Sequence, residues 1–459
     1  MIYLGAFIAV LFIILTAWWL MKQINPQAVL ITTGLLMLIV SLCLGLGMPA
    51  LSESTGSVVF DLFKIIKETF SVNLIRVGLM IMTIGGYVSY MKVIKASDAL
   101  VYVSMRPLAI FKKYPYLLAT MVIPIGQLLF ICTPSAAGLG LLLVASIYPV
   151  LVSLGISPLS ALSVIAFCTI YDMGPGSANT ARAAELVGLD NMSYFVEYQL
   201  PLAATVTLFL MVTSYFTNRY FDRKDKESGK FVPQEVKAGD MKVEVPLIYA
   251  VLPVLPLILL VVFSRYLQLT HPAIELDTTT AMLVSLFIAM FFEFLRTRSL
   301  DGVFNSIKYF WNGMGDVFSS VVTLIVSAEI FSKGLIRLGF IDALVEGSTH
   351  LGLSGIGIAI LMTIIIFGAA ALMGSGNASF FSFGPLVPDI AAKLGISGVK
   401  MILPMQLSAS MGRAVSPIAG VIIAIAEVAG VSPMDLARRN AIPLVGSLLF
   451  MVAYHFLLG

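Results

Sequence analysis

The chain contains a series of apolar segments, many of them about 20 residues long, separated by polar stretches. A helix of about 20 apolar residues spans the hydrocarbon core of a membrane. Hydrophobic residues make up 59% of the chain and charged residues 12%, whereas soluble domains average about 45–50% and about 25%. The sequence therefore predicts an all-α polytopic membrane protein. The apolar segments lie near 2–21, 28–47, 72–91, 116–152, 159–187, 199–218, 246–263, 278–295, 315–332, 354–394, 401–429 and 440–457.

Several short patterns occur twice in the same order, which indicates an internal repeat. Leu154-Gly155-Ile156-Ser157 returns as Leu394-Gly395-Ile396-Ser397, 240 positions later. Asp98-Ala99-Leu100-Val101 returns as Asp342-Ala343-Leu344-Val345, 244 positions later. Paired breaks at corresponding points of two halves are typical of transporters whose binding site lies between the repeats.

Two of the apolar stretches, 116–152 and 354–394, are too long for one crossing and carry small polar residues in the middle. We interpret each as a re-entrant hairpin, although two full crossings per stretch would also fit their length. A helix with a polar break follows each hairpin, at 159–187 and 401–429. Each half then has five crossings and one hairpin, and the odd number inverts the second half. The predicted domains are a first inverted repeat at 1–218, a hydrophilic linker at 219–245 and a second inverted repeat at 246–459.

The basic residues favour this inverted arrangement. With five crossings per half, the basic loops and the linker face one side, which the positive-inside rule identifies as the cytoplasm. The loops at 48–71 and 333–353 then lie outside, and both termini are predicted to be periplasmic. We interpret the linker as a cytoplasmic solvated tether, with a regulatory binding segment as the alternative.

Four polar breaks interrupt the apolar segments, at 132–137, 172–180, 373–379 and 410–420. Non-helical backbone survives at membrane depth only where protein or a water-filled cavity surrounds it. Each helix that restarts after a break presents a positive N-terminus, which suits carboxylate or phosphate oxygens. We therefore expect the breaks to bind an anionic substrate. The candidate binding residues are Thr133, Ser135, Ser177, Asn179, Thr180, Ser375, Gly376, Asn377, Ser379, Ser410, Arg413 and Ser416.

Arg413 is the most informative of these residues, because an arginine in an apolar segment needs a partner or a wet cavity. Its guanidinium matches a substrate carboxylate, and the alternative is an internal ion pair with Asp172 or Glu427. The Gly374–Ser379 segment has two interpretations as well, ligand contact or close helix packing. Asp172, Glu329 and Glu427 are candidates to bind a coupling proton or sodium ion, and Asp172 could instead pair with Arg182 or Arg413.

Three segments together resemble the anaerobic C4-dicarboxylate carriers of the DcuC type, which belong to a larger ion-transporter group. They are 374–378, 412–420 and the hairpin sequence at 135–142. The resemblance implies uptake, efflux or exchange of succinate, fumarate, malate or aspartate across a bacterial inner membrane. It also implies a homodimer in which a transport domain moves against a scaffold. Where the family is expected to read Ser-Gly-Asp, this chain has Ser177-Ala178-Asn179, so an amide replaces a carboxylate at this break.

Other classes of function fit the sequence less well. A sodium/proton antiporter, or a carrier of another organic anion on the same fold, is the nearest alternative, and Arg413 favours an anionic substrate over it. A membrane enzyme would need a cluster of His, Cys or paired carboxylates, which the sequence does not suggest. Cys43, Cys132 and Cys168 follow no metal-site spacing. We therefore expect no metal, no cofactor other than a coupling Na⁺ or H⁺, no nucleic acid partner, and contact with membrane lipid.

Overall fold

The computed structural model describes residues 2–111, 113–228, 244–264, 266–267, 274, 276–350 and 354–458. Within these ranges the regular structure is entirely helical, and nine helices are long and apolar enough to cross a membrane. The predicted class, an all-α polytopic membrane protein, is confirmed.

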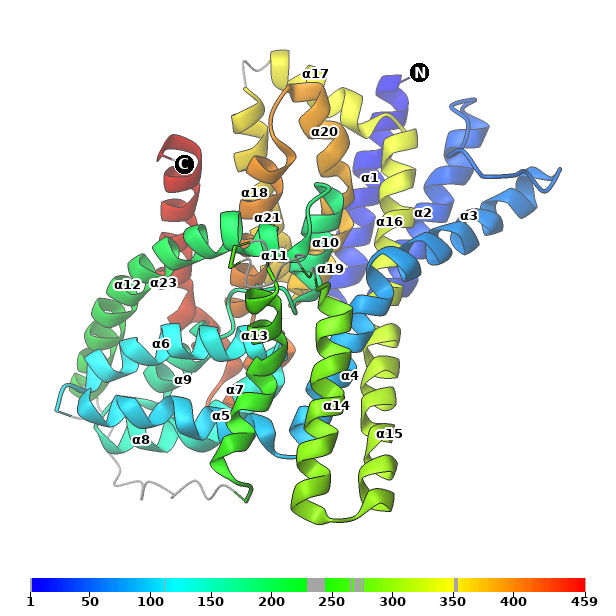
Figure 1. Cartoon of the computed structure of the whole chain (residues 1–459). Coiled ribbons are helices and arrows are strands. Elements are labelled where there is room, and N and C mark those ends of the chain that lie inside the picture. Colours follow the sequence, from blue (N-terminus) through cyan, green and yellow to red (C-terminus); the bar gives the residue numbers. More distant parts are fainter. Residues whose placement is uncertain are drawn as a thin grey trace.

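One set of helices, which we call the frame, occupies mainly the right-hand part of the molecule (Figure 1). Its helices pack closely where glycines remove side-chain bulk: α2 meets α16 at Gly34, and α4 meets α15 at Gly85 and Gly313. Small residues allow such close approach of membrane helices. The frame comprises α1 (Ile2–Met21), α2 (Pro26–Cys43), α3 (Val58–Asn73), α4 (Leu79–Val93), η4 (Leu247–Val254), α13 (Leu255–Val262), α14 (Thr278–Thr297), α15 (Leu300–Val317) and α16 (Thr323–Arg337).

Two long frame helices each contain one π-helical turn. η1 (Leu74–Gly78) joins α3 to α4, and η5 (Phe318–Val322) joins α15 to α16, 244 positions later. Both helices begin earlier than the segments predicted at 72–91 and 315–332. The prediction of a loop throughout 48–71 is therefore wrong, because the polar residues of 58–71 recur at helical spacing on α3. Single π-turns occur frequently at functional sites.

The outer loop predicted at 333–353 is also largely helical. α16 continues to Arg337, and α17 (Phe340–His350) follows after a two-residue turn. α5 (Ala96–Met105) stands at the matching place in the first half and packs against η4, as α17 packs against α1. These two short helices connect the frame to the remaining helices.

The remaining helices, which we call the hairpin group, contain both predicted hairpins and both broken helices. The chain turns at 133–135 and 374–375, and the breaks lie at 168–177 and 415–419. The inversion of the two halves remains a prediction. The group comprises α6 (Pro115–Cys132), α7 (Ala136–Ser146), α8 (Tyr148–Ser153), α9 (Pro158–Phe167), α10 (Ala178–Leu186), α11 (Asn191–Ser193), η3 (Tyr194–Gln199), α12 (Leu200–Glu227), α18 (Gly355–Met373), α19 (Gly376–Phe383), α20 (Val387–Leu394), α21 (Gly398–Ala414), α22 (Gly420–Ala429) and α23 (Pro433–Ala453).

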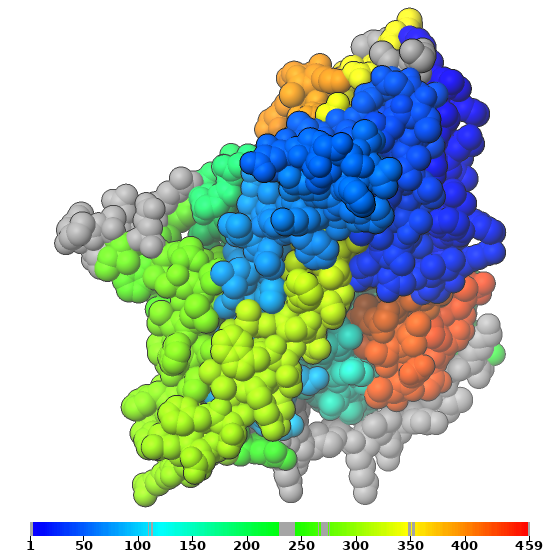
Figure 2. All heavy atoms as spheres, turned by 90° about the vertical axis from the view of Figure 1, so that its right-hand side faces the viewer, coloured from blue at the N-terminus to red at the C-terminus, as the bar shows by residue number. Residues whose placement is uncertain are grey.

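The two ends of the chain lie toward the same end of the molecule, opposite the short α14–α15 turn (Figure 1). From the side, the residues of α1–α3 and those of α14–α16 form one face of the frame (Figure 2). The first nine residues of the predicted linker continue α12 to Glu227, while 229–243 lie outside the described residues.

Candidate functional site

Three helices of the hairpin group begin at polar breaks, and each has a serine as its N-cap. Ser135 Oγ accepts a hydrogen bond from Gly138 N at 3.3 Å at the start of α7. Ser177 caps α10 and Ser375 caps α19 in the same way, at 3.3 Å and 3.2 Å. An N-cap satisfies only one of the free N–H groups in the first turn, so each helix start keeps a positive partial charge.

These three helix starts converge on one cavity of about 380 Å³ between the hairpin group and the frame. Gly138 of α7, Ala178 of α10 and Asn377 of α19 all line it, as do α4, α15 and η5 on the frame side. The volume falls within the roughly 300–1,000 Å³ of small-molecule sites. The cavity is therefore suited to a small anion.

Four of the predicted site residues line this cavity: Thr133, Ser135, Asp172 and Asn377. Thr133 is buried and donates its hydroxyl to Leu129 O at 2.8 Å. The exposed Ser135 and the half-buried Asn377 present polar atoms from the two hairpin tips. The structure thus brings together the two hairpin turns and the first break.

Asp172 is held in place by polar groups from the start of α10 and from α21. Ser177 Oγ donates to its Oδ1 at 2.7 Å, and its backbone N donates to Ser410 Oγ at 3.4 Å. Gln406 Nε2 donates to the Asp172 carbonyl at 3.2 Å, and Tyr194 in turn donates to Gln406 Oε1 at 2.9 Å. The sequence reasoning missed Gln406, although a lone glutamine within an apolar helix was an available signal.

The break before α10 is supported by a second glutamine, Gln199, which the sequence reasoning also missed. Its Oε1 accepts from Gly174 N at 3.0 Å and from Thr180 Oγ1 at 3.1 Å. Gly174 adopts a φ of +101°, and a Cβ there would come within 2.7 Å of Ile131. Only glycine accommodates both constraints.

The other predicted residues lie behind the cavity wall. Asn179 is fully buried, and neither its Oδ1 nor its Nδ2 has a partner; Ser416 Oγ also has none. Ser379 donates to Gly376 O at 2.9 Å, and Gly376 packs so closely that a Cβ would lie 2.9 Å from Ala409 O. Buried polar atoms without partners are uncommon, so Asn179 and Ser416 call for a functional explanation.

Arg413 does not line the cavity in this conformation. Its Nη2 donates to Thr169 O at 2.6 Å, at the end of α9, while its Nε has no partner. No ion pair joins it to Asp172 or to Glu427 among the described residues, and Glu427 is exposed near the end of α22. Arg413, at the end of α21, thus binds the carbonyl end of α9.

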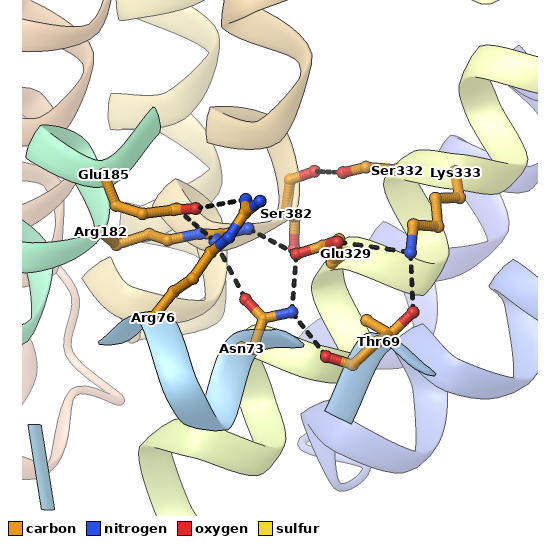
Figure 3. Close-up of polar contacts among 9 residues, drawn as sticks. All are labelled: Thr69, Asn73, Arg76, Arg182, Glu185, Glu329, Ser332, Lys333 and Ser382. Atoms are coloured by element: carbon orange, nitrogen blue, oxygen red, sulfur yellow. Dashed lines mark hydrogen bonds and ion pairs between the residues drawn. The ribbon is translucent and has the colours of Figure 1, made fainter. Parts of the chain in front are cut away.

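Glu329 lies away from the cavity, in an ion-pair network between the hairpin group and the frame (Figure 3). Its Oε2 accepts from Arg182 at 2.9 Å, and its Oε1 lies 3.4 Å from Lys333 Nζ. Arg182 therefore pairs with Glu329 and Glu185 rather than with Asp172.

Two charged residues that the sequence reasoning did not select also line the cavity. Lys92, which is exposed, lies at the C-terminal end of α4, and Asp316 lies on α15. Within the described ranges, no group of three or more His, Cys, Asp or Glu residues could hold a metal ion.

A polytopic helical fold with helical hairpins, interrupted helices and a cavity between two groups of helices is typical of membrane transporters. The model of the C4-dicarboxylate anaerobic carrier family, DcuC, matches residues 4–458. The chain belongs to this family. It is a multi-pass inner-membrane transporter and not an enzyme.

Relatives over nearly the whole chain agree with this assignment. The "Anaerobic C4-dicarboxylate transporter DcuC" of Escherichia coli K12 is 31% identical, covering 97% of this chain and 95% of that protein. The "Probable anaerobic C4-dicarboxylate transporter DcuC" of Vibrio cholerae is 33% identical, covering 95% and 94%.

Two solved transporters share the fold. Neisseria gonorrhoeae MtrF, described as illuminating a class of antimetabolite efflux pumps, has a TM-score of 0.61 at 15% identity, covering 97% of this chain and 98% of that chain. Alcanivorax borkumensis YdaH has a TM-score of 0.61 at 13% identity, covering 94% and 98%. At these identities the likeness concerns the fold alone.

Proposed function

We propose that this protein is a secondary active transporter of C4-dicarboxylates such as succinate, fumarate, malate or aspartate. The observation that carries the proposal is the convergence of three helix N-termini on one cavity of about 380 Å³. Helix N-termini stabilise carboxylate oxygens through free N–H groups and the helix dipole. Membership of the C4-dicarboxylate carrier family supports the same substrate class.

In the proposed site, Thr133, Ser135 and Asn377 contact the substrate directly, and Lys92 attracts it at the mouth of the cavity. The Asp172 carboxylate is negatively charged and would repel a dianionic substrate. A proton or sodium ion bound at Asp172 would cancel this repulsion, because opposite charges in a poorly hydrated site stabilise each other. We therefore assign cation coupling to Asp172 before Glu329 or Glu427.

The proposed transport cycle moves the hairpin group, as transport domain, against the frame, as scaffold. The hairpin group holds the three helix starts and the two broken helices, so it would carry the substrate in an elevator-like movement. We further propose the inverted repeat, a homodimer, and periplasmic termini with the α14–α15 turn in the cytoplasm, as the basic loops favour.

Counterflow in proteoliposomes tests this function. Vesicles loaded with unlabelled succinate should take up external labelled succinate, and fumarate, malate and aspartate should compete. The experiment is repeated with and without sodium and with and without a pH gradient, and empty liposomes serve as the control. If no C4-dicarboxylate competes, the substrate assignment is wrong.

The second candidate function is cation exchange, or transport of another organic anion, on the same fold. The position of Asp172 in the cavity is the observation that favours cation exchange. Sodium-driven proton movement that needs no dicarboxylate would support this candidate and contradict the first.

A further inference from the structure

Arg182 links the hairpin group to two helices of the frame (Figure 3). Its Nη2 donates to Glu329 Oε2 on α16 at 2.9 Å, and its Nη1 donates to Asn73 Oδ1 on α3 at 3.0 Å. Nη1 also donates to Glu185 Oε2 on its own helix at 2.6 Å. The Arg182 side chain is 3% exposed, so this interface is closely packed around it.

The network continues on both sides of this arginine. Lys333 Nζ lies 3.4 Å from Glu329 Oε1 and donates to Thr69 Oγ1 at 2.7 Å. Arg76, on the π-turn η1, donates from Nη1 to Glu185 Oε1 at 3.3 Å. We call Arg76, Arg182, Glu185, Glu329 and Lys333 the charge network.

The frame positions equivalent to this network line the cavity instead. At the 244-residue offset of the two π-turns, Glu329 corresponds to Gly85, Lys333 to Ser89, Thr69 to Gly313 and Asn73 to Val317. All four of these counterparts border the cavity. Within the described ranges, no ion pair joins α7 or α22 to α4 or α15.

We propose that the charge network is a one-sided latch, which holds the hairpin group in the conformation whose cavity opens beside Lys92. This inference depends on the proposed alternating-access function and extends it to the resting state of the protein. When the hairpin group moves, Arg182 and Glu185 must leave Glu329, Arg76 and Asn73, and the separated charges must be hydrated. The four equivalent frame positions carry Gly85, Ser89, Gly313 and Val317, which cannot form these ion pairs, so they offer no comparable hold to the opposite conformation.

Partial exposure of the carboxylates fits a contact that must open and close. The side chains of Glu185 and Glu329 are 18% and 20% exposed, so water already reaches the rim of the network. A fully buried ion pair would cost far more to separate. The network therefore sets the ratio of two conformations rather than blocking their exchange.

Thiol labelling from each side of the membrane tests the latch. Ser135→Cys, introduced after replacement of Cys43, Cys132 and Cys168, places a thiol in the cavity. A membrane-impermeant maleimide should label it rapidly from the side of the α14–α15 turn and slowly from the other side. Glu329→Gln or Arg182→Gln should raise labelling from the second side at least about tenfold, since a population shift follows the lost contact energy.

Arg439→Gln is the matched control. Arg439 is similarly buried and pairs with Asp222 and Asp225, but all three belong to the hairpin group, on α23 and α12. Its loss should leave the ratio of labelling from the two sides unchanged. If Arg182→Gln does not accumulate, Asn73→Ala replaces it, because it removes a neutral acceptor from the same interface.

The latch is overturned if two folded variants are labelled from each side at the same rate as the protein without them. These variants are Glu329→Gln and either Arg182→Gln or its replacement Asn73→Ala. The assay contains no dicarboxylate, so it can be interpreted whether or not the substrate assignment holds. A failure of counterflow with a normal shift in labelling would instead contradict the proposed substrate and leave the latch in place.

Discussion

The two interfaces between the hairpin group and the frame differ in the chemistry of equivalent positions. On the side of α3 and α16, Asn73, Glu329 and Lys333 bind Arg182 or its partners. On the side of α4 and α15, the counterparts Val317, Gly85 and Ser89 leave a cavity of about 380 Å³. A repeated backbone can thus carry a strong contact at one interface and open space at the other.

With the proposed latch, two similar halves need not give two equally stable end conformations. Electrostatic contacts at one interface lower the free energy of one conformation. The two conformations are equally populated only if the other conformation gains contacts of the same energy. The ratio of the two populations changes tenfold for each 1.4 kcal/mol or so. Substitutions in a few side chains can therefore reset the resting conformation without changing the helices.

The largest effect is expected from Arg413, whose Nη2 donates to Thr169 O and so joins the two broken helices. We expect Arg413→Ala to reduce labelled succinate uptake about 10- to 100-fold, because a hydrogen bond from a charged group contributes roughly 1.5–3 kcal/mol. Arg413→Lys should retain part of the uptake, since it keeps the charge. Protein level and thermal unfolding provide the control, and normal uptake by the alanine variant would show that transport does not need Arg413.

The cavity side should be more sensitive to side-chain size than to charge. A Cβ on Gly313 would lie 2.5 Å from Ser89 Cβ and 2.7 Å from Gly85 O, whereas one on Gly315 would meet nothing within 4 Å. We expect Gly313→Ala to lower the free energy of unfolding by about 1–3 kcal/mol, as overpacking does.

Gly315→Ala is the matched control on the same helix, and it should be neutral or stabilising by up to about 1 kcal/mol. Thermal unfolding of the purified variants in detergent measures both effects. Equal midpoints for the two variants would show that α4 and α15 are not as closely packed as described.

The smallest effect is expected at the mouth of the cavity. Lys92 is exposed, so Lys92→Gln should raise the KM for succinate only about two- to fivefold, the range of an exposed charge pair. The effect should disappear at high salt, which screens exposed charges. Lys22→Gln removes another exposed cation that does not line the cavity and should leave KM unchanged.

Much of the fold followed from local signals in the sequence. Apolar length predicted the helices, and the clusters around Pro134, Gly174, Gly374 and Pro417 lie at the two turns and the two breaks. The main error was the loop predicted at 48–71, because the hydrophilic residues at the start of α3 recur at helical spacing.

The site was predicted only in part. Four predicted residues line the cavity: Thr133, Ser135, Asp172 and Asn377. Non-helical backbone at membrane depth is stable only inside protein or beside a water-filled cavity, so the breaks pointed to them. The predicted contact between Arg413 and substrate stays a prediction, and its bond to Thr169 O depends on how two broken helices pack. The assignment of Glu329 to ion coupling stays a prediction, and its neighbours in space were not foreseeable.

The sequence by itself determined the helical membrane class and the positions of the breaks, because hydrophobic length and backbone-breaking residues act locally. Only the tertiary structure decided that Arg182 pairs with Glu329, 147 positions away, while the equivalent frame positions border a cavity. Ion pairs depend on distances between helices that are remote in the chain, and no local pattern encodes those distances.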